Sequence, residues 1–514
     1  MREPYDLLII GGGINGVGIA RDAAGRGLRV LLCEQEDLAW GTSSASSKLI
    51  HGGLRYLEYF EFRLVREALA EREVLISLAP HMIRPMRFIL PHDHTLRPMW
   101  MIRAGLFLYD HLSGRRRLRG SYRIDMRRHL AGKPLQERIR KGFVYSDCWA
   151  DDARLVVLNA LDAHRRGAEV RTRTAVRSAT RTGGGTGGLW HVKLAMPDGT
   201  PAGEARAHCL INAAGPWIGN VLEQALHAQP GNSHLQLVKG SHLVVPRLYE
   251  GDHAYILQHV DRRVIFVLPF LGEYSLIGTT DEAFEGDPHQ AEMSAAESEY
   301  LCGAVSRFFR QTITPSDVVW SFAGVRPLYS AAKDANNPSA ISREYELELE
   351  DAEGAAPLLS VIGGKITAYR QVAQHAMEKL RPYLEPRTGS LGAPWTHSQP
   401  LPGGDLPNAD PDAALAGVAR RWPWLPEGLA TRLFHAHGTR MDLVLGDACD
   451  LPGLGRHFGG TLYQREVAYL VRHEWARTAE DILWRRTKEG LALNAAQVAE
   501  LEGVIQEMLA EQPR

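Results

Sequence analysis

The chain has 514 residues, and at roughly 150 residues per domain this length favours two to four domains. Hydrophobic residues make up 45% of the chain and charged residues 23%, which excludes an extended disordered or collagen-like protein. Lysine and arginine total 59 against 60 aspartate and glutamate, and this near-neutral balance argues against a nucleic-acid-binding protein.

The amino-terminal residues predict neither a secretion signal nor a membrane span. Residues 1–6 precede a short apolar strand and lack the long apolar stretch of a signal peptide. No run of 18 apolar residues follows. The five cysteines are scattered without a Cys-x-x-Cys pair, which favours free thiols in a cytoplasmic protein and predicts no metal site.

The first segment has the pattern of a dinucleotide-binding unit. An apolar strand at residues 7–10 meets the turn Gly11-x-Gly13-x-x-Gly16, a helical pattern and a second strand that ends at Glu34. Glycines let the backbone approach a pyrophosphate, the helix start offers N–H groups, and the carboxylate can bind ribose hydroxyls. Because this carboxylate would repel a 2′-phosphate, NADP is disfavoured.

A second formal match to the glycine spacing starts at Gly183, but a strand-like run follows it, so we expect a hairpin loop there. One dinucleotide site predicts that electrons pass directly from a substrate to a single bound cofactor.

The remaining elements follow in chain order. We expect a hydroxyl-rich loop at 42–47, helices at 61–78, 153–166 and 297–310, an irregular segment at 80–128, and strand-rich segments at 168–215, 238–280, 319–327 and 358–362. A glycine turn at 363–365 then enters a helix. Residues 384–413 are dense in proline and glycine and predict a linker, after which the pattern is almost wholly helical.

The run at residues 41–57 is long and specific, and there the chain resembles the FAD-dependent glycerol-3-phosphate dehydrogenases of aerobic bacteria and mitochondria. These enzymes belong to the wider fold family of D-amino-acid and glycine oxidases. The resemblance continues at residues 145–147, 151–155, 212–217, 239–242, 277–281, 324–328, 363–370 and 469–488.

The resemblance implies an α/β chain (α+β overall): a Rossmann-like FAD-binding domain with an antiparallel-sheet substrate domain, plus a helical C-terminal domain. It implies interleaved regions in residues 1–385, with FAD mainly at 1–80, 145–225 and 320–385 and substrate mainly at 81–144 and 226–319. A linker at 386–413 and the helical domain at 414–514 follow. The implied reaction is oxidation of sn-glycerol 3-phosphate to dihydroxyacetone phosphate by hydride transfer to FAD, with electrons passed to a membrane quinone.

The resemblance also assigns the cofactor contacts. The expected FAD-binding residues are Gly11, Gly13, Ile14, Asn15, Gly16, Glu34, Thr42, Ser43, Ser44, Ser46, Ser47, Leu49, Gly215, Gly364, Lys365, Ile366 and Thr367.

The reaction needs a proton acceptor and cations that bind a phosphate. His51 is the first candidate for proton acceptor, because an imidazole with a pKa near 6.5 can be neutral at working pH; His242 is a weaker alternative. A guanidinium meets phosphate in a bidentate geometry, which makes Arg55, Arg326 and Arg343 the anion-binding candidates. The resemblance implies substrate contact for all three, with Arg326 near the reacting carbon. Arg343 is equally explained as a charge on a strand surface. The remaining substrate contacts that the resemblance implies are Tyr56, Thr279 and Lys365.

Residues 97–128 hold nine arginines and two aspartates around the apolar runs 99–102 and 106–109. Aromatic residues beside arginines suit an anionic bilayer surface, and predict peripheral attachment to the inner face of the cytoplasmic membrane. A solvated loop over a buried apolar patch explains the pattern equally well. The expected assembly is a homodimer, with the C-terminal helices as a cap or subunit contact.

Three alternatives remain open from the residues. One is an oxidase of the same fold that transfers electrons to oxygen and makes peroxide. A second is an amine or amino-acid oxidase, which has little need of several phosphate-binding arginines. A third is a flavin-binding partner protein without enzymatic activity, such as an RNA-modifying scaffold.

Overall fold

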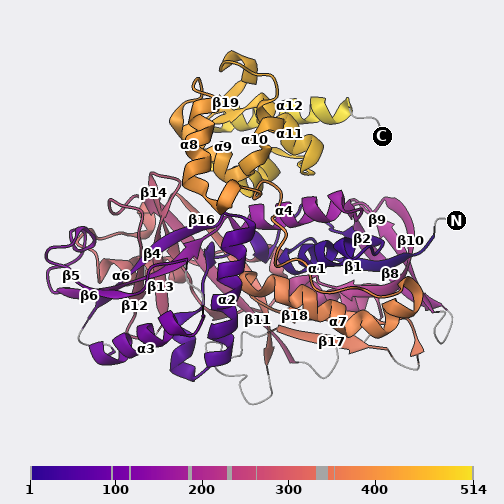
Figure 1. Cartoon of the computed structure of the whole chain (residues 1–514), viewed down its shortest axis with the longest axis horizontal. Helices are drawn as coiled ribbons and strands as arrows, with labels where there is room; N and C mark the ends of the chain where they lie inside the picture. Colours follow the sequence, from indigo (N-terminus) through magenta and orange to yellow (C-terminus); the bar gives the residue numbers. More distant parts are fainter. Residues whose placement is uncertain are drawn as a thin grey trace.

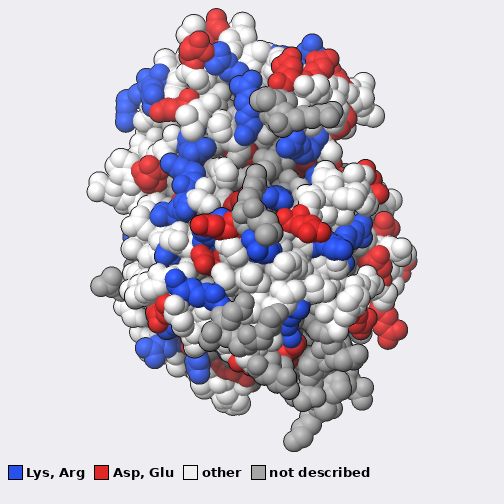
Figure 2. All heavy atoms as spheres, turned by 90° about the vertical axis from the view of Figure 1, so that its right-hand side faces the viewer, with Lys and Arg blue, Asp and Glu red and all other residues white. Residues whose placement is uncertain are grey.

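The computed structural model describes residues 3–93, 97–114, 117–182, 188–227, 234–261, 263–330, 345–351 and 354–511. Two β-sheets with their helices form a body, and the C-terminal helices form a separate lobe above it (Figure 1). On the face in Figure 2, acidic and basic side chains are interspersed.

The first sheet is mainly parallel and is built around β1 (Tyr5–Ile10). Its strand order is β17 (Tyr345–Glu350), β18 (Leu358–Gly363), β10 (Pro201–Asn212), β1, β2 (Val30–Cys33) and β7 (Glu169–Arg171), with the hairpin β8 (Ala175–Thr182) and β9 (Leu189–Ala195) attached to β10. Helices α1 (Ile14–Gly25), α4 (Asp152–Arg165) and α7 (Tyr369–Thr388) share a core with one face of this sheet. The parallel pairing of β1 with β2 and β10 brings their carboxyl ends to one edge, where the predicted glycine turn lies.

The second sheet is mainly antiparallel. Its order is β15 (Glu282–Ala283), β11 (His234–Pro246), β14 (Tyr274–Gly278), β13 (Val264–Phe270), β12 (Ala254–Gln258), β4 (Arg84–His92), β6 (Lys141–Trp149) and β3 (Leu49–Ile50), with β16 (Trp320–Ser330) on β11 and β5 (Tyr122–Asp125) on β6.

Alternate residues of the second sheet's strands enter two different cores. On β11, Leu243 and Val245 pack with α6 (Ala295–Ser306), whereas Val244 packs with α2 (Phe62–Leu78) and α3 (Met99–His111). The sheet is therefore covered on both faces.

The lobe holds its own hydrophobic core. It consists of α8 (Pro411–Arg421), α9 (Glu427–His437), α10 (Met441–Leu445), α11 (Gln464–His473), α12 (Ala495–Ala510) and the hairpin β19 (His457–Gly459) and β20 (Leu462–Tyr463). Buried ion pairs attach it to the body, including Arg154 with Glu474 and Arg486 with Asp37.

The structure confirms the expected fold class and most of the elements. The segment 80–128 is a correction, because it is not irregular but contains β4, α3 and β5. The linker also begins later than expected: α7 continues through Pro382 and Pro386 to Thr388, since its apolar face is buried against the first sheet. Residues 320–330, expected with the cofactor region, form a strand of the second sheet.

The domain boundaries stay a prediction. The loop at 183–187 lies outside the described residues, and its flanks β8 and β9 pair antiparallel, as a hairpin requires. All five cysteines are described and free.

Candidate functional site

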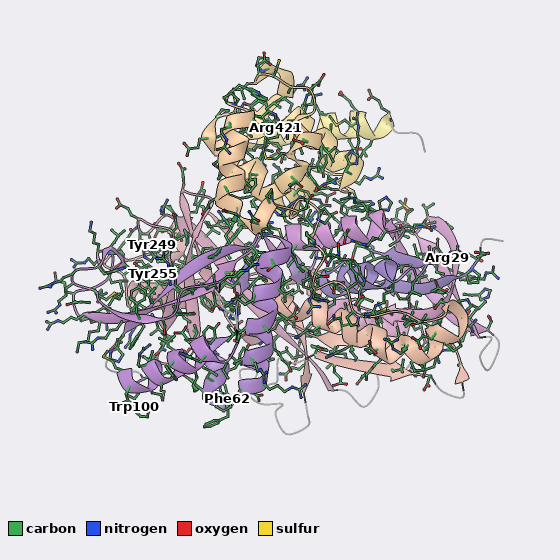
Figure 3. All side chains as sticks on the ribbon, in the orientation of Figure 1. Arg29, Phe62, Trp100, Tyr249, Tyr255 and Arg421 are labelled. Atoms are coloured by element: carbon green, nitrogen blue, oxygen red, sulfur yellow. The ribbon has the colours of Figure 1, made fainter. Side chains whose placement is uncertain are left out.

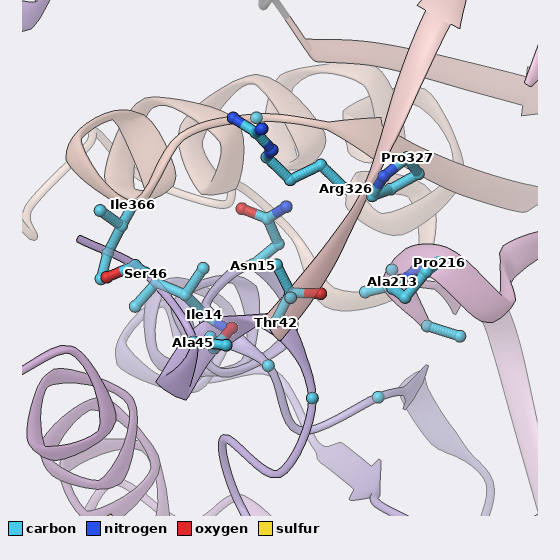
Figure 4. Close-up of a pocket in the computed structure, with 18 of the residues that line it drawn as sticks. Ile14, Asn15, Thr42, Ala45, Ser46, Ala213, Pro216, Arg326, Pro327 and Ile366 are labelled. Carbon is cyan, nitrogen blue, oxygen red and sulfur yellow. The ribbon is translucent and has the colours of Figure 1, made fainter. Parts of the chain in front are cut away.

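A cavity of about 360 Å³ lies where the two sheets meet. Its lining comes from the ends of β1 and β2, the loop at 40–47, the turn at 213–217, strands β11, β13 and β16, and the turn at 363–367. Figure 4 shows side chains from three of these segments, Asn15, Thr42 and Arg326, gathered around the same space.

The glycine turn forms a backbone cradle at one wall of the cavity. Gly11 has φ +110°, and a Cβ there would lie 2.5 Å from the carbonyl oxygen of Ala213. Gly13 lines the cavity beside Ser43, whose Oγ accepts a hydrogen bond of 3.0 Å from the N–H of Ile14. Gly16 is not among the lining residues; its missing Cβ lets α1 pack against Gly11, because a Cβ would lie 2.0 Å from the Gly11 oxygen.

Glu34 is fixed at the carboxyl end of β2. Its carboxylate accepts hydrogen bonds from the N–H of Gly12 at 2.6 Å and of Glu36 at 2.8 Å. Burial raises the pKa of Glu34 to about 7, against these two hydrogen bonds, which lower it. The carboxylate therefore lies where the ribose of a dinucleotide would need an acceptor.

Asn15 lines the cavity and carries a hydrogen-bond acceptor that no described residue uses. Its amide nitrogen donates to the Gly363 carbonyl at 3.0 Å, while its Oδ1 is buried with no hydrogen-bond partner among the described residues. Gly364 follows with φ +96°, and Ile366 and Thr367 continue the wall, as do Leu49 and Gly215. Together with the glycine cradle, this orphaned oxygen fits a dinucleotide cofactor.

The hydroxyls of the loop at 42–47 are largely engaged by the protein. Thr42 donates to the Val325 carbonyl, and Ser47 is hydrogen-bonded to His242 at 2.8 Å. Ser46 donates to Asp152 at 2.7 Å, and the buried ammonium of Lys48 pairs with the same carboxylate. These contacts fix the loop's shape, so that Thr42, Ser43, Ser46 and Ser47 line the cavity.

The expected substrate residues meet at the same cavity. His51, Tyr56, Thr279, Arg326 and Lys365 all line it. The Lys365 ammonium lies 3.7 Å from the centroid of the Tyr56 ring, and the Arg326 guanidinium pairs with Asp281. The cations of Lys365 and Arg326 therefore line the same cavity as the His51 imidazole and the Thr279 hydroxyl, together with the glycine turn.

The two candidate histidines have different surroundings. His51 contacts the edge of Phe266, with ring centroids 6.2 Å apart. His242 is buried, stacks on Phe322 at 4.9 Å and is bonded to Ser47. Burial lowers the pKa of His242 to about 3, so its imidazole is neutral at physiological pH.

Three predicted residues do not line the cavity. Arg55 extends to the Tyr59 hydroxyl at 3.3 Å, Ser44 donates to the Gly41 carbonyl, and Gly16 has the packing role described above. Arg343 lies outside the described residues.

Sequence reasoning missed several lining or supporting residues: Trp40, Trp217, Gly240, Phe266 and Asp281. Trp217, Gly240 and Asp281 belong to the runs 212–217, 239–242 and 277–281 that carried the resemblance, which was the signal that could have found them. Trp40 and Phe266 lie outside those runs, and their sequence pattern indicates burial alone.

Two family profiles match this chain. A family described as FAD dependent oxidoreductase matches residues 6–370, and the C-terminal domain of alpha-glycerophosphate oxidase matches residues 394–512. A glycerol-3-phosphate dehydrogenase of Pseudomonas aeruginosa is 51% identical over 100% of this chain and 97% of its own length. The aerobic glycerol-3-phosphate dehydrogenase of Escherichia coli is 50% identical over 96% of each chain.

Another relative is named for a different substrate. A D-erythritol 1-phosphate dehydrogenase of Brucella abortus is 50% identical over 97% of each chain. Among solved structures, the glycerol-3-phosphate dehydrogenase from Bacillus halodurans complexed with FAD is similar with a TM-score of 0.76 and 26% identity, covering 99% of this chain and 91% of that one.

Proposed function

Because this chain belongs to the family of FAD-dependent glycerol-3-phosphate dehydrogenases, we propose that it oxidises sn-glycerol 3-phosphate to dihydroxyacetone phosphate and passes the electrons to a membrane quinone. The observation that carries the proposal is the single cavity in which His51, Arg326 and Lys365 lie beside a dinucleotide cradle. FAD is the cofactor.

The side chains divide the chemistry between them. FAD, when bound, supplies the acceptor for the hydride that leaves C2 of the substrate. His51 accepts the proton of the C2 hydroxyl, since it is the candidate base that lines the cavity without being sealed into the protein core. Lys365 and Arg326 supply positive charge for the phosphate and for the oxygen that becomes the ketone.

The substrate is the point at which the relatives differ, and D-erythritol 1-phosphate is the second candidate. Steady-state reduction of a soluble ubiquinone analogue by the purified holoenzyme distinguishes the two, with glycerol as the control that lacks phosphate. We expect kcat/KM for glycerol 3-phosphate to exceed that for D-erythritol 1-phosphate at least tenfold, or about 1.4 kcal/mol. A higher value for the tetritol phosphate would replace the proposed substrate.

The same assay separates a dehydrogenase from an oxidase. With oxygen as the only acceptor, we expect turnover to fall and peroxide to account for little of the substrate consumed. Stoichiometric peroxide at an undiminished rate would favour the oxidase alternative.

An apolar surface supports peripheral attachment to an anionic membrane, which we place at the inner face of the cytoplasmic membrane. Phe60, Trp100 and Phe107 are 78%, 73% and 53% exposed, and Arg63 and Arg103 lie on the helices that carry the patch. Figure 3 shows Phe62 and Trp100 on the lower edge, far from Arg421 in the lobe. Large exposed aromatics beside arginines suit the interface of an anionic bilayer.

The patch and the cavity meet at one element. The short helical turn Leu54–Tyr59 places Tyr56 in the cavity wall and ends beside the exposed Phe60. A quinone in the bilayer would therefore approach the protein near the cofactor. None of the described helices is both long enough and apolar enough to span a bilayer. Arg115 and Arg116 of the arginine cluster lie outside the described residues.

The expected homodimer is also part of the proposal. Light scattering of the detergent-solubilised protein tests it, and a monomeric mass would contradict it.

A further inference from the structure

We propose that Glu297, the first-turn carboxylate of α6, positions the catalytic guanidinium of Arg326 through Thr280 and Asp281. The inference rests on the proposed function, because it assigns Glu297 a part in that same site. Glu297 does not line the cavity and touches neither substrate nor cofactor.

The chain of contacts starts at the cavity. Arg326 lies on β16 and pairs with Asp281, which follows β14. Gly240 on the neighbouring strand leaves room for Arg326 and Thr279, because a Cβ there would lie 3.2 Å from a guanidinium nitrogen of Arg326 and 2.7 Å from Thr279 Oγ1. The guanidinium therefore pairs with a carboxylate and lies close to the backbone of Gly240.

The position of Asp281 depends on its neighbour Thr280. The buried hydroxyl of Thr280 donates to Glu297 Oε1 at 2.6 Å and accepts from the N–H of Ser241 at 2.9 Å. Ser241 also donates its own hydroxyl to Glu297 Oε1 at 2.9 Å. The segment that carries Asp281 is thus tied to both β11 and α6.

Glu297 is held far more firmly than a surface carboxylate. It is 1% exposed, and the Lys239 ammonium lies 2.8 Å from Oε2. Burial opposes its ionisation, but the hydrogen bonds from Lys239, Ser294 and Thr280 lower the pKa of Glu297 below its ordinary value. The carboxylate is therefore charged at working pH and accepts all of these bonds.

A role in helix capping does not explain this arrangement. Glu297 does form a capping box with Ser294, in which each accepts from the other's backbone N–H. A capping box leaves the glutamate free to face solvent, whereas this one is buried against three side chains of β11 and the 279–281 segment. Of these contacts, the one with Thr280 leads through the adjacent Asp281 to Arg326.

The test uses the FAD-loaded enzyme and separates the two roles. Glu297→Gln keeps a side chain that suits a capping box but weakens the acceptor for Thr280 and Lys239. We expect kcat/KM for glycerol 3-phosphate to fall at least about tenfold, because small misplacement of a catalytic group is costly. Ser294→Ala is the matched control: it removes the cap but keeps the Thr280 contact, so its kcat/KM should stay within about twofold of the wild type.

A double-variant cycle identifies Arg326 as the target. In an Arg326→Lys background, which lacks the planar guanidinium, Glu297→Gln should lower kcat/KM by less than about twofold. A full tenfold loss in that background, or equal losses for Glu297→Gln and Ser294→Ala, would overturn the inference.

Thr280 provides a second route if Glu297→Gln fails to fold or to retain FAD. Thr280→Val removes the hydroxyl and should lower kcat/KM as Glu297→Gln does. Thr280→Ser keeps the hydroxyl and should keep the activity. Wild-type activity in Thr280→Val would contradict the inference. If the wild type itself does not oxidise glycerol 3-phosphate, the proposed function fails instead, so the two failures are distinguishable.

Discussion

His51 and His242 both line the cavity, and we propose His51 as the residue that accepts the proton. The ring of His242 is stacked on Phe322 and bonded to Ser47, and its low pKa makes it a weak proton acceptor. We expect His51→Ala to slow flavin reduction by a factor of 10² to 10⁴, with a smaller effect on substrate affinity. Rapid-mixing spectroscopy measures the rate and the affinity separately; an unchanged reduction rate would exclude His51 as the base.

Glu34 predicts a pH dependence for cofactor binding. Without FAD the pKa of its half-buried carboxyl is about 7, whereas ribose hydroxyls would donate to the ionised form. Binding below pH 7 then releases a proton, so FAD affinity should rise with pH, by up to tenfold per unit, and level off above about 7. Titration of the FAD-free protein at several pH values measures this slope, and Glu34→Gln should abolish it. A slope that persists in Glu34→Gln would contradict the assignment.

The same pKa makes the contribution of Glu34 to the stability of the FAD-free protein depend on pH. The ordinary pKa of a glutamate is near 4.5. Between pH 4.5 and about 7, Glu34 is therefore mostly ionised in the unfolded chain but mostly protonated in the folded protein. The free energy of unfolding therefore falls as pH rises through this range.

The sequence predicts which residues lie in the site's segments, but it does not predict the direction in which each side chain points. His51, Tyr56 and Arg326 lie in runs matched by the resemblance, and the structure brings them together. Arg55 was also expected to contact the substrate, but it does not line the cavity. On a helical turn of about three residues, neighbouring side chains diverge by about 120°, so Tyr56 faces the cavity while Arg55 faces away from it. Residue spacing alone does not fix that direction.

Among the elements, long periodic helices and the first parallel strands were predictable, because one apolar face or a continuous apolar run determines them. α3 was missed since its exposed face carries large apolar side chains, which conceal the usual alternation of polar and apolar residues. The prolines of α7 predict a helix end, but burial of Leu380 and Leu384 against the core outweighs them.

The exposed face of α3 and the turn before α2 predict a membrane-binding surface. Phe60→Glu combined with Trp100→Glu should lower the protein fraction that floats with phosphatidylglycerol-containing vesicles at least tenfold, because burial of each aromatic contributes about 1.5–3 kcal/mol. Leu443→Glu is the matched control, since Leu443 is 58% exposed on α10 in the lobe. Flotation of the double variant at the wild-type level would exclude this face as the anchor.

At the scale of the whole molecule, the lobe is joined to the body by charges that are removed from water. Asp37, just beyond the cofactor strand β2, accepts from Arg485 at 2.7 Å and from Arg486 at 2.8 Å, and all three are buried. The sequence could not predict these partners, because 448 residues separate Asp37 from Arg485.

Asp37→Ala should lower the free energy of unfolding by about 3–5 kcal/mol, because it removes the carboxylate that the buried guanidinium groups of Arg485 and Arg486 share. Asp442→Ala, which breaks the exposed pair with Arg421, should cost less than about 1 kcal/mol. Denaturant unfolding measures both, and equal losses would show that the junction does not depend on buried charge.

We propose that one bound flavin takes electrons directly from a phosphorylated polyol in this cavity. The anaerobic absorption spectrum of the purified protein before and after saturation with glycerol 3-phosphate tests this proposal. We expect a yellow protein whose flavin band bleaches when the substrate is added. A colourless protein, or a flavin band that the substrate leaves unchanged, would contradict it.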